Sequence, residues 1–197
     1  MAQEKSPEHL SPTAVKVAVG LVALLAVGVV VASSILGSDE DPAAAGPSPT
    51  TISAPPRTGP VALVGVDAPA ARSAECTTLV GALPKELPDG EDTLRRLPIA
   101  EPAPPAALAW GDDRGEPVVL RCGLGRPSEL TPTAGLREVD KVRWLPIEGD
   151  GAFTWYLVDR GAYVALTVPA DTGTGPLQEV SATVARVLPA RPVDTAP

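Results

Sequence analysis

The run EVDKVRWLPIEGDGAFTWYLVDRGAYVALTV, residues 138–168, decides the fold of this chain. Within it, stretches rich in β-branched and aromatic residues alternate with two short breaks that contain glycine, which is the spacing of β-hairpins. The run therefore predicts three consecutive antiparallel strands. They are expected at residues 138–146, 152–158 and 162–168, with turns at 148–151 and 159–161.

The sequence on either side adds two strands and two helices to this meander. Residues 61–66 and 117–122 are short apolar runs of strand type. Apolar residues at helical spacing favour helices over 71–83 and 176–188, whereas the Pro-rich run 98–105 cannot be a central strand. These elements predict an α+β domain with a mainly antiparallel sheet of four to five strands flanked by two helices.

An uncharged, largely aliphatic run precedes this domain at residues 17–38. As a helix it reaches roughly 33 Å, enough to cross the apolar core of a bilayer. Lys5 and Lys16 precede the run and an acidic stretch at 39–41 follows it. Because positive residues stay inside, we predict a single-pass cell-membrane protein with a cytoplasmic N-terminus and an extracytoplasmic C-terminal domain.

A cleavable signal peptide is the alternative reading of the same run. Val30 and Ala32 form a small-residue cleavage pattern before Ser33, and cleavage there would produce a secreted protein. Glu4 and Glu8 beside the lysines, and the length of the apolar run, favour a retained anchor.

The composition divides the chain into five parts. They are a short cytoplasmic N-terminus (1–16), the transmembrane helix (17–38), a Pro/Ala/Ser-rich linker (39–60), the extracytoplasmic α+β domain (61–188) and a disordered tail (189–197). Segments rich in Pro, Ala and Ser bury too little apolar surface to offset the entropy lost on ordering. We therefore expect the linker to act as an extended tether.

Cys76 and Cys122 are the two cysteines, and both follow the apolar run. In an oxidising compartment outside the membrane, two cysteines most simply form a disulfide. A nucleophilic cysteine is the alternative, but it requires an activating base, usually histidine. The single histidine, His9, lies on the predicted cytoplasmic side. The sequence therefore favours a structural disulfide.

The same lack of histidine in the domain excludes Ser-His-Asp and Cys-His hydrolases and zinc sites with histidine ligands. Carboxylates cluster within turns that contain glycine, and solvated turns explain them without a catalytic role. The clusters are Asp89/Glu91/Asp92, Asp112/Asp113 and Glu148/Asp150. No calcium-loop or phosphate-loop pattern is present. We predict no catalytic residue, no metal ligand and no cofactor.

Charge and aromatic residues bear on the partner. The chain has a net charge of −8 and few aromatic residues, so nucleic acid is not an expected partner. Trp110 and Trp144 are expected in the core. Trp155 and Tyr156 are adjacent on a predicted strand, so one of them should face outward, and we predict both as candidate binding residues.

An ordered series of motifs links the domain to a known family. The series includes Cys76, Ala-Trp-Gly at 109–111, Leu-Arg-Cys-Gly at 120–123 and Thr-Val-Pro at 167–169. Together they resemble an actinobacterial family of membrane-anchored or secreted proteins, domain of unknown function 3515. The resemblance covers nearly all of 76–188 and the N-terminal apolar run. It implies an envelope location and the disulfide, and it brings no catalytic residues.

The sequence therefore predicts a non-enzymatic binding or accessory module of the cell envelope. Its partners would be the membrane, through residues 17–38, and an envelope protein or cell-wall component. The alternative is a carboxylate-dependent enzyme acting on cell-wall glycans. That alternative needs an acidic pair about 5–10 Å apart in a cleft.

Overall fold

The computed structural model describes residues 57–195. The predicted transmembrane helix 17–38, the N-terminus 1–16 and nearly all of the linker 39–60 lie outside these residues. Within 57–195, no helix is both long enough and apolar enough to cross a membrane.

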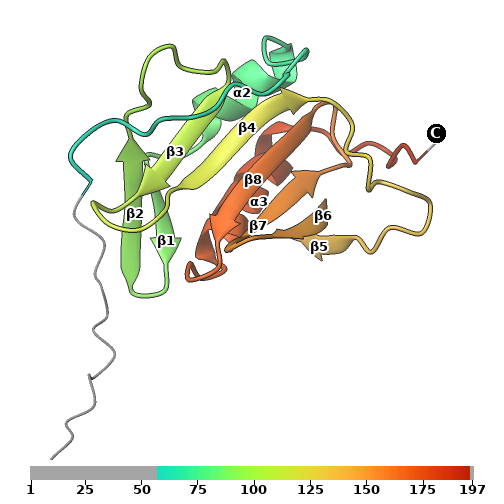
Figure 1. The fold of residues 1–197 in the computed structure, drawn as a ribbon. Coiled ribbons are helices and arrows are strands. Elements are labelled where there is room, and N and C mark those ends of the chain that lie inside the picture. Colours follow the sequence, from blue (N-terminus) through green and yellow to red (C-terminus); the bar gives the residue numbers. More distant parts are fainter. Residues whose placement is uncertain (1–56, 196–197) are drawn as a thin grey trace, which may run out of the picture. The chain divides into compact units, whose positions relative to one another are not determined.

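One eight-stranded sheet forms the domain (Figure 1). Its strands are β1 (Glu86–Asp89), β2 (Asp92–Leu97), β3 (Ala107–Gly111), β4 (Val118–Leu124), β5 (Arg137–Val139), β6 (Val142–Gly149), β7 (Ala152–Leu157) and β8 (Tyr163–Pro169). Their order is β1-β2-β3-β4-β8-β7-β6-β5, and every neighbouring pair is antiparallel. Two meanders, β1–β4 and β5–β8, therefore join through the pairing of β4 with β8.

Two helices, α2 (Ala74–Ala82) and α3 (Gly175–Val187), lie behind the sheet in Figure 1. Helix α3 contacts both edge strands, β1 and β5, as well as β6 and β8. Because the first and last strands touch the same helix, the sheet curves around α3. The approach is close: a Cβ on Gly175 would lie 2.3 Å from the carbonyl oxygen of Pro88 in β1.

Local sequence explains both helices. Ser73 caps α2, since its Oγ accepts a hydrogen bond from the backbone N–H of Cys76 at 3.2 Å. In α3, a proline stands in the first turn, where its missing N–H costs nothing, and Leu177, Val180 and Val184 are buried at helical spacing. Both predicted helices are confirmed, each within three residues of its expected ends.

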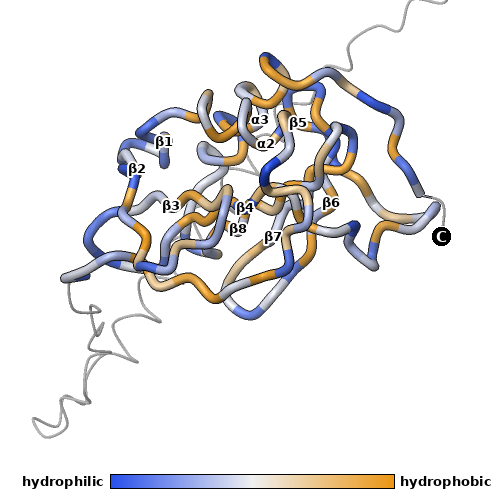
Figure 2. The backbone as a smooth tube through the Cα atoms, turned by 90° about the horizontal axis from the view of Figure 1, so that it is seen from above, coloured by the Kyte–Doolittle hydropathy of each residue, from blue (hydrophilic) through white to orange (hydrophobic). Residues whose placement is uncertain are grey.

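The main core lies between these helices and the sheet. Its large, fully buried side chains include Leu79, Trp110, Leu120, Trp144, Leu166 and Val180. Both tryptophans have a partner for their indole N–H: Trp110 Nε1 donates to the carbonyl of Pro84 at 3.1 Å, and Trp144 Nε1 donates to Ser181 Oγ at 2.9 Å. The expected core role of both is confirmed. Figure 2 shows the same backbone from above, with hydrophobic residues in orange and hydrophilic residues in blue.

The predicted disulfide is confirmed. Cys76 Sγ of α2 and Cys122 Sγ of β4 lie 1.99 Å apart, both residues are fully buried, and their sequence separation is 46. The bond fastens α2 to the centre of the sheet. Since disulfides persist in oxidising compartments, it indicates an extracytoplasmic domain.

The prediction of four to five strands was too low. Strands β1, β2 and β3 were missed because ELPD and DTLRRL are charged and polar, without apolar alternation, and ALAWG is short. The expected strand 138–146 is in fact two strands, β5 and β6. Asp140 and Lys141 make the turn between them with φ values of 49° and 62°. Two successive residues with positive φ are usually Asn-Gly or Asp-Gly. Here they are Asp140 and Lys141, so the sequence contains no glycine that would indicate the turn.

The strand expected at 61–66 was also wrong. Only Val61 pairs, through a single parallel bridge to Ile99. Strands β2, β3 and β4 each already have two neighbours, so none of these three strands offers the run a free edge. Residues 57–70 instead cross the sheet face opposite the helices, where Arg121 Nη1 donates to the carbonyl of Val64 at 3.0 Å.

Candidate binding site on the open face of the sheet

Trp155 and Tyr156 lie side by side on β7 and face opposite sides of the sheet. Trp155 pairs with Leu166 and packs against the main core beneath the helices. Tyr156 pairs with Ala165 and packs with a smaller apolar cluster on the other side, which we call the open face. The predicted alternation along this strand is confirmed, and the two residues belong to two separate surfaces.

On the helix side, Trp155 borders a small apolar pocket. Phe153, Leu177 and residues 168–174 form most of the rest of its wall, and its volume is about 230 Å³. Phe153 is 39% exposed, whereas Trp155 is half-buried against the core. The pocket therefore offers little more than the side of one ring to a partner.

On the open face, Tyr156 lines a larger depression of about 480 Å³, which we call the open-face groove. Thr154 and Ile147 lie beside Tyr156 on the floor. One wall comes from Val66 and Asp67, and the other from residues 124–129. The groove is thus bounded by two connecting segments laid across a flat, half-buried sheet surface.

Three tertiary contacts hold the wall that contains Val66. Val61 bridges Ile99, the carbonyl of Val64 accepts the bond from Arg121, and Ala70 N–H donates to the carbonyl of Gly123 at 3.0 Å. Gly123 has a φ of 87°, and a Cβ there would lie 2.2 Å from the backbone nitrogen of Ala71. Only glycine satisfies both conditions.

The same wall exposes apolar side chains. Val64 is 77% exposed and Val66 is 50% exposed. With Phe153, they are the large hydrophobic residues exposed in the described part of the chain. Val66 lines the groove with Tyr156 and Ile147, and Val64 lies two residues earlier in the same segment. Exposed apolar surface of this kind marks an interaction site.

Arg121 lies on the same face, in a row of paired residues that crosses the sheet. The row runs Ala107, Arg121, Ala165, Tyr156 and Leu145. Burial lowers the pKa of the Arg121 guanidinium from its ordinary value, because desolvation disfavours the charged form. An arginine nevertheless keeps its charge at neutral pH. The open face therefore holds a positive charge two strands away from Tyr156.

The three acidic clusters predicted from sequence lie at one end of the sheet, opposite to the end where β4 leads into residues 124–129. The turns β1–β2, β3–β4 and β6–β7 all lie there, with the connection from β8 to α3. We call this region the acidic end. Its carboxylates are Asp89, Glu91, Asp92, Asp112, Asp113, Glu116, Glu148, Asp150 and Asp171. Sequence could not show this convergence, because these turns are separated by long stretches of chain.

A cavity of about 200 Å³ at the acidic end is lined by four of these carboxylates, those of Asp89, Asp112, Glu116 and Asp171, together with Arg114. Two of them accept backbone hydrogen bonds: Asp89 Oδ1 accepts from Gly173 N–H at 2.7 Å, and Asp112 Oδ1 accepts from Arg114 N–H at 2.8 Å. Among residues 57–195, no group of three or more His, Cys, Asp and Glu residues is arranged to hold a metal ion.

Arg57 stands between two wider clefts at this end, of about 810 and 660 Å³. Its guanidinium donates to the carbonyl of Gly115, and its backbone N–H donates to that of Asp113. Most of the residues that line both clefts are exposed. Arg57 fastens the start of the domain to the β3–β4 turn.

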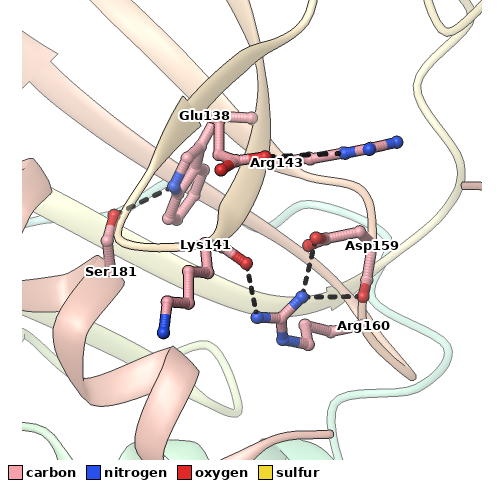
Figure 3. Close-up of polar contacts among 7 residues, drawn as sticks. Glu138, Lys141, Arg143, Asp159, Arg160 and Ser181 are labelled. Carbon is pink, nitrogen blue, oxygen red and sulfur yellow. Dashed lines mark hydrogen bonds and ion pairs between the residues drawn. The ribbon is translucent and has the colours of Figure 1, made fainter. Parts of the chain in front are cut away.

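A buried ion pair lies in the β7–β8 connection. Arg160 Nη1 is 2.7 Å from Asp159 Oδ2, and the side chains are 2% and 7% exposed. Arg160 Nη2 also donates to the carbonyl of Lys141 at 3.1 Å, as Figure 3 shows. The pair therefore joins two neighbouring turns. The backbone N–H of Arg191, in the segment expected as a disordered tail, donates to the carbonyl of Asp159 at 2.8 Å.

Of the open-face residues, sequence reasoning selected Tyr156 and missed Arg121, Val64 and Val66. The valines resembled one more strand, and nothing local indicates that they are exposed. Arg121 did leave a signal: it is the charged residue of the Leu-Arg-Cys-Gly motif, at a position in β4 that alternates with buried Leu120 and Cys122.

Comparisons with known proteins agree with the motifs. The model of the family described as "Protein of unknown function (DUF3515)" matches residues 15–193. No curated protein and no solved structure matches the chain. The match covers the whole predicted membrane span and all but the last two of the described residues, so the chain belongs to the DUF3515 family.

Proposed function

We propose that this protein is a membrane-anchored binding module of the cell envelope, whose extracytoplasmic domain holds a partner or cell-wall component in the open-face groove. The observation that carries the proposal is the exposed side chain of Val66 beside Tyr156 in the groove, with exposed Val64 two residues earlier in the same segment. Exposed apolar side chains on a braced wall favour binding, because covering them removes apolar surface from water.

The envelope location draws on two features of the chain. The disulfide indicates an oxidising compartment, and the run 17–38 has the length and flanking charges of a single-pass anchor. In this proposal the N-terminus is cytoplasmic. Protease added to intact protoplasts should then degrade the domain and spare a short N-terminal fragment. Protection of the whole chain would contradict it, and recovery of the domain in the medium with Ser33 at its N-terminus would establish secretion instead.

Photocrosslinking in the native membrane tests the binding surface. A photoreactive amino acid is placed at Val66 on the open face or at Asp113 at the acidic end, in the full chain. We expect crosslinks to an envelope component from position 66, and fewer from position 113. Tyr156→Ala should weaken the crosslinks from position 66, because aromatic residues carry much of the energy of an interface.

Phe153→Ala is the matched control. Phe153 lies on the same strand as Tyr156, and the substitution removes an aromatic side chain from the helix-side pocket instead of the open face. It should leave the crosslinks from position 66 unchanged. Equal losses in the two variants, or crosslinks from position 113 alone, would contradict the proposal. Melting temperatures of both variants establish that the fold is retained.

The second candidate is an enzyme that uses carboxylates on cell-wall glycans. The four carboxylates around the cavity at the acidic end are the observation that favours it. Removing a general acid or base lowers the rate by orders of magnitude, whereas neutralising a solvated turn residue has little effect. A single substitution, Glu116→Gln or Asp171→Asn, that abolishes complementation in a folded protein would establish the enzyme.

A further inference from the structure

We infer that residues 62–66 bind an extended apolar segment of a partner polypeptide, which pairs with them edge to edge as an added β-strand beside the open-face groove. The inference rests on the proposed function of the groove, and it names the class of partner. A cell-wall glycan does not belong to this class.

The segment begins in strand pairing. Val61 N–H donates to the carbonyl of Pro98 at 2.8 Å, and the carbonyl of Val61 accepts from Ala100 N–H at 2.9 Å. These two bonds make the parallel bridge between Val61 and Ile99. In an extended chain, successive residues direct their N–H and C=O groups to opposite edges. Every second residue from 62 onward therefore directs these groups away from Ile99.

Exposure alternates along the segment, as it does in a strand that lies with one face against the protein. Val61 is buried and Leu63 is half-buried, whereas Ala62, Val64 and Val66 are exposed. This pattern indicates an extended segment with an outward row of apolar side chains. The row contains no charged residue and no proline, which are the residues that blunt exposed strand edges.

The backbone donors of the segment are unused. In the described part of the chain, no N–H group from Ala62 to Asp67 donates a hydrogen bond, and five of these six residues are exposed. A row of exposed, unpaired backbone groups is a template for another strand. Only a second extended polypeptide presents N–H and C=O groups at the matching spacing, so the backbone selects the class of partner.

The free edge adjoins the groove. Val66 belongs both to the segment and to the groove lining, where Tyr156 and Ile147 accompany it. The carbonyl of Val64 accepts from Arg121 of β4, so the edge that points away from Ile99 faces the middle of the sheet. A strand added at this edge can cover the apolar side chains of the groove while it pairs with the segment.

The test uses the full chain in its native membrane, with the photoreactive amino acid at Val66. Val64→Pro removes an N–H from the edge that faces the groove, and Gly65→Pro, the matched control, removes one from the other edge. Neither N–H is bonded in the described domain, and a Cβ on Gly65 would have no atom within 4 Å. We expect Val64→Pro to reduce the crosslinks about tenfold and Gly65→Pro to retain them, because one hydrogen bond of the added strand is lost.

Val64→Ala separates the backbone from the side chain, because it shortens the side chain and keeps the N–H. It should reduce the crosslinks less than Val64→Pro does. Mass spectrometry of the crosslinked product should place the bond in an uncharged, apolar segment of a second protein. Melting temperatures of the three variants establish that the fold is retained.

A synthetic copy of the captured segment then tests pairing on the unchanged protein in nanodiscs. It should slow hydrogen exchange at Ala62, Val64 and Val66. Two further copies are N-methylated at alternate amides, one for each edge, and keep every side chain. We expect one of them to lose binding and the other to retain it, because a single edge pairs with the segment. This comparison decides the matter even if a proline variant fails to fold.

Several outcomes would overturn the inference. These are a glycan or a second copy of this chain in the crosslinked product, equal losses in Val64→Pro and Gly65→Pro, a loss in Val64→Ala as large as that in Val64→Pro, and equal binding of both N-methylated peptides. Crosslinks from position 66 that depend on Tyr156 would leave the proposed function standing in each of these cases. An absence of crosslinks from position 66 would end both proposals.

Discussion

At the scale of single residues, the domain depends on a few buried polar groups that have few alternative partners. Ser181 accepts from Trp144 and donates to the carbonyl of Leu177 at 2.6 Å, so one hydroxyl joins α3 to β6. The pair of Asp159 and Arg160 likewise joins two turns. Removing one member of such a pair leaves a buried group without a partner, which costs more than the lost bond.

We expect Ser181→Ala to lower the free energy of unfolding by about 1–3 kcal/mol, because Trp144 Nε1 would be buried without an acceptor. Urea unfolding measures the change. Trp144→Phe provides the partner variant, and the double variant should lose less than the sum of the two single losses, since both remove the same bond. Strict additivity would show that this hydrogen bond does not contribute.

At the scale of elements, two contacts attach other segments to β4, one on the helix face and one on the open face. The disulfide ties α2 to one side of this strand at Cys122, and the next residue, Gly123, lies against residues 70–71 on the other. A register shift between Cys122 and Leu124 marks the same point. Residues 120–123 of the Leu-Arg-Cys-Gly motif thus supply core packing, a half-buried charge, a covalent link and a close backbone approach.

For the disulfide, we expect no free thiol when the denatured, non-reduced protein is labelled. Cys76→Ser and Cys122→Ser should each lower the free energy of unfolding by about 4 kcal/mol, because both open the same loop. Urea unfolding of both variants provides the comparison. Two reactive thiols in the native protein, or clearly unequal losses in the two variants, would contradict this prediction.

For the close approach, we expect Gly123→Ala to cost at least about 1–3 kcal/mol, since alanine is strained at this positive φ and its Cβ would clash with residues 70–71. Gly125→Ala is the matched control, because no atom lies within 4 Å of a Cβ built there. Hydrogen exchange in residues 61–70 should rise in the first variant alone. The same protection in both would show that Gly123 does not position the wall of the groove.

At the scale of the whole domain, charge is distributed unevenly. The acidic end gathers carboxylates from four connections, whereas the opposite end mixes Arg137, Arg143, Arg160 and Arg191 with acidic residues, including the ion pairs Arg143–Glu138 and Arg191–Glu75. Like charges at one end repel each other and oppose folding, and salt screens this repulsion. Asp89 and Asp112 also accept backbone hydrogen bonds. Neutralising the other, exposed carboxylates therefore tests the repulsion without removing these hydrogen bonds.

We expect the triple variant Glu91→Gln, Asp113→Asn and Asp150→Asn to raise the melting temperature at low salt. The gain should shrink in 1 M salt, where the screening length falls to about 3 Å. Asp140→Asn, at the opposite end and beside Lys141, should bring no such gain. A gain that is independent of salt would mean that repulsion is not its cause.

The sequence by itself determined the properties that depend on composition, local periodicity and compartment. These are the family, the α+β class, both helices, the β6–β8 region of the meander, the disulfide and the opposite facing of Trp155 and Tyr156. Most of these properties are set within a short stretch of sequence. The disulfide is the exception, and it follows from the chemistry of two cysteines in an oxidising compartment. The predicted anchor at 17–38 lies outside the described residues and stays a prediction.

Only the tertiary structure decided the rest. Strands β1, β2 and β3 have weak local patterns, and they form because β4 and α3 give them a partner and a surface to cover. The run 61–66 has a strong local pattern, yet it forms no strand, because every neighbouring strand edge is already occupied. The open-face groove and the acidic end follow from pairings between distant segments. Exposure of Val64 and the placement of Arg121 on the same face as Tyr156 depend on those pairings, and no local window of sequence contains them.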